Sequence, residues 1–141
     1  MVAQGRIIAL LLLVTLLVTA CGEQGVGGNA TSEPQAPTPQ ESMVGLTSAL
    51  EQDDTRFALT FVAESAQDQY SRYFSKLEQV NRLARFGRDL ASLTLVSQTD
   101  REARFNGILT VNTKRFNTTY IFVPGRNGVW LLYDMRGEQI P

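Results

Sequence analysis

The hydrophobic pattern of this chain changes its period once, near Ser92. From residue 42 to residue 91, apolar side chains recur every three or four positions, as on helices with one buried face. After Ser92, apolar and polar residues alternate in short runs separated by turn residues, which is typical of strands. A block of helices followed by a meander of strands predicts an α+β fold. We expect N-terminal helices packed against a curved antiparallel four-stranded sheet, with one shared core.

The helical half is expected to contain three helices. The first covers residues 42–52, with Ser42 as its N-cap. Asp54 is placed to cap a short second helix. Ser65 and Asp68 resemble a capping box that opens the third helix, whose pattern extends toward residue 91. Within that pattern, Gly87 indicates either a bend or a close packing contact.

The strand half is expected to form a four-stranded meander. Gly128 lies in the last hairpin loop and suits a positive φ. The last strand is continuously apolar, which predicts burial on both of its faces. The expected strands are residues 93–99, 103–111, 116–123 and 129–133.

The N-terminal segment is predicted to direct the chain out of the cytoplasm. Arg6 precedes an apolar run, residues 7–20, that is shorter than the roughly 20 residues of a spanning helix. Residues 1–20 therefore fit a signal peptide. Residues 21–40 are rich in Gly and Pro and are expected to form a disordered tether. The folded domain is then residues 41–141, a size that allows one domain.

The junction between the first two segments carries a known motif. The residues Leu17-Val18-Thr19-Ala20-Cys21-Gly22 resemble the lipobox of bacterial lipoproteins, and Cys21 is the single cysteine of the chain. The resemblance implies cleavage after Ala20 and acylation of Cys21, so that fatty acyl chains such as palmitate hold the protein to a membrane of the cell envelope. Gly22 in place of Asp favours the periplasmic face of the outer membrane in a Gram-negative cell. The alternative is an uncleaved N-terminal helix with an incidental Cys21.

The order of motifs in the domain resembles the nuclear transport factor 2-like (cystatin-like roll) superfamily, and within it small lipoproteins of uncharacterised function. The resemblance implies a cone-shaped roll with a cavity between helices and sheet. Homodimerisation through the sheet is common in that superfamily. It implies no single activity, because one fold hosts many functions. The matching segments are Ala49-Leu50-Glu51-Gln52-Asp53-Asp54, Ala58 to Leu77, Leu93-Thr94-Leu95-Val96, and Tyr120 to Leu132.

The residue types available restrict the chemistry. The chain has no histidine, the commonest general base and nitrogen ligand for metals. Its formal net charge of -1 argues against a strongly basic nucleic-acid binder. Asp53-Asp54 could suggest a metal pair, but helix capping explains it better. We expect no catalytic residue, metal or cofactor, because the acids of the strand half fall at turns or strand ends: Asp100, Glu102, Asp134 and Glu138.

Two groups of side chains could contact a partner. Arg82, Arg85 and Arg88 recur every three residues and form a possible basic interaction face for anionic lipid or an acidic partner. A solvated helix face is the simpler interpretation. The domain is also rich in aromatic residues, of which some could line an apolar pocket while most form the core.

These features predict a lipid-anchored, extracytoplasmic protein whose domain is a non-catalytic binding or interaction module. Its ligand could be a small apolar molecule, or its partner an envelope protein or a second copy of the chain. The alternatives are a structural component of the cell envelope and a small enzyme that uses the cone cavity. An enzyme would require a buried carboxylate near a tyrosine in that cavity.

Overall fold

A computed structural model describes residues 35–141 of the chain. The predicted signal peptide and residues 21–34 of the predicted tether lie outside the described residues. The described part consists of four α-helices and two 3₁₀ turns followed by four strands, so the predicted α+β class is confirmed. The elements are α1 (Pro39–Glu51), α2 (Thr55–Ala58), η1 (Leu59–Phe61), η2 (Glu64–Ala66), α3 (Gln67–Gln79), α4 (Leu83–Ala91), β1 (Thr94–Gln98), β2 (Ala103–Val111), β3 (Lys114–Pro124) and β4 (Trp130–Gln139).

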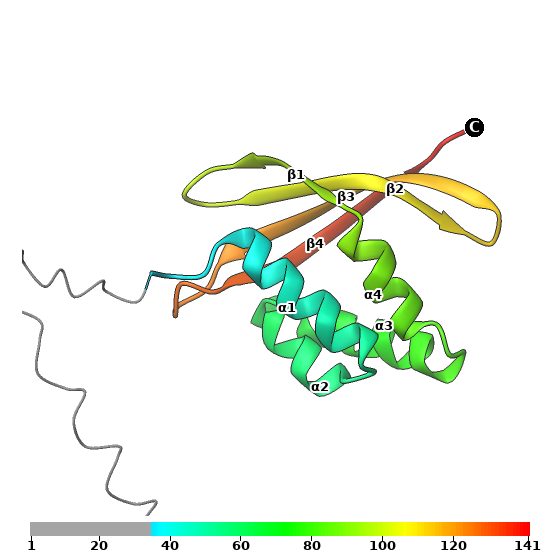
Figure 1. Cartoon of the computed structure of the whole chain (residues 1–141), viewed down its shortest axis with the longest axis horizontal. Helices are drawn as coiled ribbons and strands as arrows, with labels where there is room; N and C mark the ends of the chain where they lie inside the picture. The colour runs from blue at the N-terminus through cyan, green and yellow to red at the C-terminus, as the bar shows by residue number, and fades with distance from the viewer. Residues whose placement is uncertain (1–34) are drawn as a thin grey trace, which may run out of the picture. The chain divides into compact units, whose positions relative to one another are not determined.

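The four strands form one open antiparallel sheet in the order β1-β2-β3-β4. All four helices lie on one face of this sheet (Figure 1). The register is interrupted in β1 between Leu95 and Ser97, and in β4 opposite Ile121 and Phe122. Such bulges increase the local twist and bend a sheet. The inner face of the sheet therefore curves around the helices.

One hydrophobic core joins the helices to the inner face of the sheet. Its largest fully buried side chains come from both halves of the chain: Tyr70, Phe74, Leu46 and Leu50 from the helices, and Tyr120, Phe122 and Leu132 from the sheet. Phe105 and Phe122 from neighbouring strands pack edge to face, with ring centroids 5.3 Å apart. Aromatic pairs of this geometry add roughly 0.5–1.5 kcal/mol to the burial of their area.

Helix α1 begins earlier than the sequence predicts. Its N-cap is Thr38, whose Oγ1 accepts a hydrogen bond from the Glu41 amide at 3.2 Å. The Glu41 carboxylate accepts one from the Thr38 amide in return, at 2.7 Å, so the two residues form a capping box. The prediction of Ser42 as N-cap is therefore wrong. Residues 38–40 were assigned to the tether because prolines surround them, but proline at the first helical position suits a helix start.

The third predicted helix differs from the structure at both ends. Ser65 lies in the η2 turn, and α3 starts without any side-chain cap. The expected continuous helix is broken at Asn81, which has a φ of 52°. The Arg82 amide donates to the Leu77 carbonyl and the Asn81 amide to the Glu78 carbonyl, as in a Schellman motif. Asparagine tolerates this left-handed conformation, so the chain turns and restarts as α4.

Helix α4 lies close against α1 because Gly87 has no side chain. A Cβ at Gly87 would stand 2.9 Å from the Thr47 carbonyl oxygen and 3.0 Å from the Glu51 amide nitrogen. Both atoms are backbone and cannot rotate away. Of the two predicted roles of Gly87, close packing is confirmed.

Asp54 caps the second helix as predicted. Its carboxylate accepts a hydrogen bond from the Phe57 amide at 2.9 Å.

Strand β4 is longer and less buried than predicted. It runs to Gln139 rather than ending at residue 133. Tyr133 is 49% exposed, so the prediction that the strand is buried on both faces is wrong. The helices cover only one face of the sheet, and the apolar run reflects one buried face plus a bulge at Tyr133. The predicted positive φ of Gly128 is confirmed at 74°.

No helix among residues 35–141 combines the length and the apolar character needed to cross a membrane.

The free edge of β4 is partly covered by the segment that follows the η1 turn. The Ala63 amide donates to the Leu132 carbonyl at 2.9 Å, and Val62 forms a parallel bridge with Leu132. Pairing of this kind shields an edge strand from further strand addition.

Ser42, although not a cap, connects the two halves of the fold. Its buried Oγ accepts a hydrogen bond from the Trp130 amide at 3.1 Å, which joins α1 to the start of β4. The variant Ser42→Ala would leave a buried amide without an acceptor. We expect it to lower the free energy of unfolding by about 1–3 kcal/mol. Urea unfolding followed by the fluorescence of Trp130, the single tryptophan, measures this change.

The matched control is Ser48→Ala in the same helix, where the hydroxyl is exposed. It should change the free energy of unfolding by less than about 0.5 kcal/mol. Equal losses in the two variants would show that the Ser42–Trp130 bond does not stabilise the contact between helix and sheet.

Candidate functional site

A cavity of about 310 Å³ lies between helices α3 and α4 and the inner face of β2, β3 and β4. It is mostly apolar, and each strand contributes alternate residues because alternate side chains point to the same face. The lining residues are Tyr73, Phe86, Asp89, Leu109, Val111, Phe116, Thr118, Tyr120, Met135 and Gly137.

The cavity exists because small residues replace large ones at one end of the inner face. Near the β3–β4 loop, Phe105, Phe122 and Leu132 fill the space under the helices. Toward the β2–β3 hairpin, the paired positions on β3 and β4 are Thr118 and Gly137. A Cβ built at Gly137 meets only the Thr118 Oγ1, at 3.9 Å. The core is therefore packed at one end and hollow at the other.

A second chamber of about 410 Å³, which we call the mouth, adjoins the cavity, and both are open to solvent. The two chambers share four lining residues, Tyr73, Phe86, Asp89 and Val111. The mouth lies between two turns, the α3–α4 break and the β2–β3 hairpin. The remaining residues of the mouth are Leu77, Arg82, Arg85, Thr110, Asn112 and Thr113.

One hydrogen bond joins the two turns across the mouth. The Arg82 Nη1 donates to the Asn112 Oδ1 at 3.0 Å. Both partners are set by backbone geometry: Asn81 has a φ of 52°, and the hairpin residues Asn112 and Thr113 have φ values of 47° and 69°. Positive φ at both central residues matches the I′ turn that suits the twist of a two-residue hairpin. The turns thus place a fixed cation at the mouth.

Two buried tyrosine hydroxyls near the cavity have no hydrogen-bond partner among the described residues. They belong to Tyr70 and Tyr120, which are 1% and 0% exposed. Burial raises the pKa of both phenols above the ordinary value, and nearby negative charge, from Asp134 for Tyr70 and from Asp89 for Tyr120, raises each further. Both hydroxyls are thus neutral donors. A buried, unpaired hydroxyl is costly, so each one calls for an explanation.

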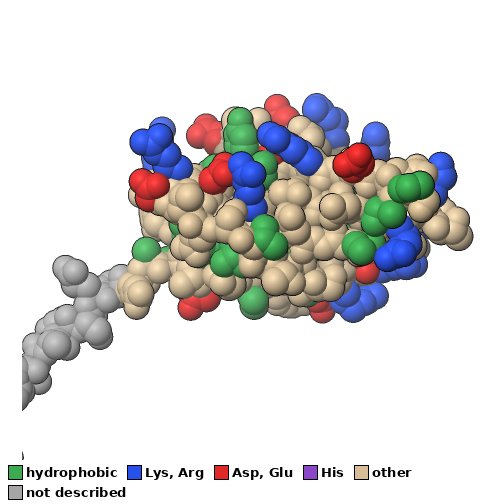
Figure 2. Space-filling model, turned by 90° about the horizontal axis from the view of Figure 1, so that it is seen from above, with side chains coloured by type: hydrophobic (Ala, Val, Ile, Leu, Met, Phe, Trp, Pro, Cys, Tyr) green, Lys and Arg blue, Asp and Glu red, His purple; other side chains and the backbone are tan. Residues whose placement is uncertain are grey.

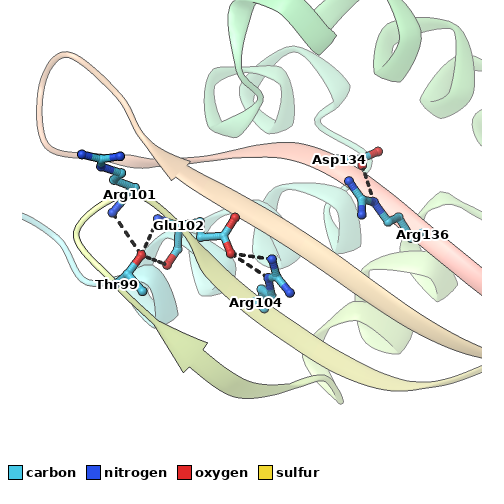
Figure 3. A network of polar contacts seen from close by, with 6 residues as sticks. All are labelled: Thr99, Arg101, Glu102, Arg104, Asp134 and Arg136. Carbon is cyan, nitrogen blue, oxygen red and sulfur yellow. Dashed lines mark hydrogen bonds and ion pairs between the residues drawn. The ribbon is translucent and has the colours of Figure 1, made fainter.

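The acids that the sequence analysis considered lie at the surface or pair with arginine. Asp100 and Glu138 are exposed. Glu102 binds Arg104 through Oε1 at 2.7 Å, and Asp134 binds Arg136 through Oδ2 at 2.9 Å (Figure 3). Within residues 35–141, no three acidic side chains form a group that could hold a metal ion.

Asp89 is a carboxylate of the cavity that the sequence analysis did not select. Its side chain is 40% exposed, and its Oδ2 lies 4.0 Å from the Arg85 Nε. Its position in the sequence, on a helix beside arginines, gives no signal of a cavity. The α4 helix, however, turns this residue toward the boundary between the two chambers.

The structure separates the three arginines of the predicted basic face. Arg82 and Arg85 line the mouth, whereas Arg88 is exposed outside both chambers. Figure 2, which views the molecule from above the sheet, shows Lys and Arg side chains gathered at the right-hand end, where the β2–β3 hairpin lies in Figure 1. The other predicted site residues, Ala20 and Cys21, lie outside the described residues.

A further hollow of about 580 Å³ lies beside the β3–β4 loop, between the 3₁₀ turns and the ends of β3 and β4. None of its lining residues carries one of the buried, unpaired polar atoms of the described region. The cavity under α3 and α4 is therefore the stronger candidate site, because it combines an apolar wall with the unpaired Tyr120 hydroxyl.

A buried hydroxyl without a hydrogen-bond partner, such as that of Tyr120, should not stabilise the protein. We expect Tyr120→Phe to leave the free energy of unfolding at neutral pH unchanged or to raise it by up to about 1 kcal/mol, because a desolvated and unpaired group is removed. The raised pKa of Tyr120 favours the unfolded chain as pH rises above its ordinary value of 10.0. Alkaline loss of stability should therefore be smaller in the variant.

Urea titrations at neutral and alkaline pH measure both effects, with the exposed Tyr133→Phe as control. If Tyr120→Phe cost more than about 1 kcal/mol at neutral pH, the hydroxyl would be part of the structural bonding rather than a group left for a ligand.

Comparison with protein families, curated proteins and solved structures finds no match to this chain. The geometry of the cavity therefore carries the functional argument.

Proposed function

We propose that this protein is a lipid-anchored, extracytoplasmic binding module that holds a small, mostly apolar ligand in the cavity under α3 and α4. The observation that carries the proposal is the mostly apolar cavity itself, whose lining includes Tyr120. A volume of about 310 Å³ falls at the lower end of the range for ligand pockets, roughly 300–1,000 Å³. An apolar wall with few polar groups is also the usual composition of such pockets.

The exposure of Asp89 supports binding over catalysis. A general base needs a positioned carboxylate with a perturbed pKa. The Asp89 side chain is 40% exposed, and its carboxylate lies 4.0 Å from the Arg85 Nε. One observation still favours a small enzyme as the second candidate: Asp89, Tyr73 and Tyr120 line one cavity. Such an enzyme would lose turnover but keep ligand in the variant Asp89→Asn.

The anchor is the second part of the proposal and rests on the sequence of residues 17–22. A single acyl chain holds a protein only marginally, whereas two or more chains give a stable attachment. Acylated Cys21 would keep the cavity beside a membrane of the cell envelope. The Gly22 that follows favours the outer membrane of a Gram-negative cell. A homodimer through the outer face of the sheet is compatible with this arrangement, because the helices cover only the inner face.

Filling the cavity should remove the ligand. Leucine at position 137 would occupy the hollow end, where a new Cβ has room beside Thr118. We expect native mass spectrometry of the full lipoprotein, gently extracted from its own membranes, to show a stoichiometric small-molecule mass on the wild type and none on Gly137→Leu. The matched control is Glu138→Leu, which adds the same side chain to the opposite face of β4 and should keep the mass.

Thermal unfolding of each variant shows that the fold is retained. A wild-type protein that carries only its own acyl chains, or a ligand that survives Gly137→Leu, would contradict the proposed cavity function. A stoichiometric protein-sized mass on the wild type would shift the proposal to an envelope partner, and a bare chain would favour the structural alternative.

The anchor has a separate test. We expect Cys21→Ala to move the protein from the detergent phase to the aqueous phase in phase partitioning, and to abolish incorporation of labelled palmitate. Ser48→Ala, which changes an exposed residue of the domain, should change neither. Unchanged partitioning of Cys21→Ala would show that residues 1–20 remain attached and hold the membrane themselves.

A further inference from the structure

The mouth of the cavity contains Arg82, whose guanidinium has no acidic partner among the described residues. The Arg82 guanidinium makes one side-chain hydrogen bond within residues 35–141, from Nη1 to Asn112. A guanidinium has five N–H donors in a rigid fork. The bond to Asn112 directs the guanidinium toward the β2–β3 hairpin, and the other donors remain available to solvent or to a ligand. Such a positioned fork suits the planar, two-oxygen geometry of an anion.

Among the charged side chains that line the mouth, Arg82 is the one without an oppositely charged partner. Asp89 is the carboxylate that lines the mouth, and its Oδ2 faces the Arg85 Nε at 4.0 Å. These two charges offset each other. Arg82 has no carboxylate within salt-bridge distance among the described residues. The mouth therefore carries a net positive charge centred on Arg82.

Beside this cation lies the more apolar chamber. The two chambers share Tyr73, Phe86 and Val111, so apolar surface continues from the mouth to the wall formed by Leu109 and Phe116. A molecule that filled both chambers would need an apolar body and a negative end. The inner chamber lies at the lower limit of ligand pockets, so it suits one chain rather than two.

We propose that the cavity binds a single-chain amphiphile with an anionic head, with its chain in the inner chamber and its head on the Arg82 guanidinium. This inference rests on the proposed function and names the class of its ligand. A free fatty acid supplies a carboxylate head, and a lysophospholipid of the membrane supplies a phosphate head. Both heads accept charge-assisted hydrogen bonds from a guanidinium.

Photo-crosslinking in the intact membrane tests the assignment with the full lipoprotein. The probes are dodecanoic acid, dodecanol and a lysophosphatidylglycerol, each with a photoreactive group at the end of its chain. The labelled peptides are mapped by mass spectrometry. We expect the anionic probes to label the strand segments that line the inner chamber, around Leu109 and Phe116, at least about tenfold more than the alcohol.

Two arginine variants separate the head group from general charge. Arg82→Gln should lower labelling by the anionic probes about tenfold and leave the weak labelling by the alcohol unchanged. Arg88→Gln makes the same charge change on α4, which follows Arg82, but outside both chambers, and should have no effect. Preference for the acid or for the lysophospholipid identifies the source of the ligand, and either preference supports the anionic head.

The results that would overturn the anionic head differ from those that would overturn the proposed cavity function. Equal labelling by acid and alcohol that is insensitive to Arg82→Gln but lost in Gly137→Leu would overturn the anionic head and leave the cavity function standing. Labelling that never reaches the inner chamber, or that survives Gly137→Leu, would overturn both.

Discussion

The inner face of the sheet is packed at one end and hollow at the other, and the rest of the structure depends on this difference. Under the helices, the inner face of the sheet is filled by Phe105, Phe122 and Leu132. Toward the β2–β3 hairpin, the inward-facing Val111 is 49% exposed. Apolar side chains in this region have partners on only one side. The space between the packed core and the exposed hairpin becomes the cavity.

The break between α3 and α4 gives that cavity its mouth. A continuous helix through residue 81 would carry Arg82 along the same axis as α3. The Schellman turn at Asn81 instead redirects the chain and leaves Arg82 facing the β2–β3 hairpin, where Asn112 binds it. Two strained turns far apart in sequence thus define one opening. Residues held in sparsely populated backbone conformations often occur at functional sites, and here they position the only side-chain bond between these two turns in the described structure.

The buried, unpaired hydroxyls of Tyr70 and Tyr120 lower the stability of the fold near the cavity. A hydroxyl removed from water without a partner loses roughly 1–3 kcal/mol of solvation. Phenylalanine at positions 70 and 120 would fill nearly the same volume without that loss. Tyrosine at both positions, together with Gly137 where a larger residue would fit, makes this region less stable than the same fold with a filled core. Binding energy from a ligand would offset this deficit, because a molecule that binds only the folded state stabilises it.

Much of the fold followed from the sequence alone. The change from a helical to a strand period near Ser92 determined the α+β class, because each period buries one face of its own element. Local chemistry also determined the Asp54 cap and the turn at Gly128, whereas it left Gly87 as either a bend or a close contact. The Thr38 cap was missed because prolines resemble a tether. The Asn81 break was missed because apolar residues continue in helical register on both sides of it.

The candidate site was decided by tertiary structure. The sequence identified an excess of aromatic residues and an arginine repeat, but it could not show that Tyr120 faces a hollow or that Asp89 and Arg82 lie at its mouth. Those positions depend on the pairing of β3 with β4, on the bulge at Tyr133 and on the turn that separates α3 from α4. Period and capping are local and can be read from neighbouring residues. A cavity is a property of contacts between distant segments, and it appears only when the helical layer and the sheet are brought together.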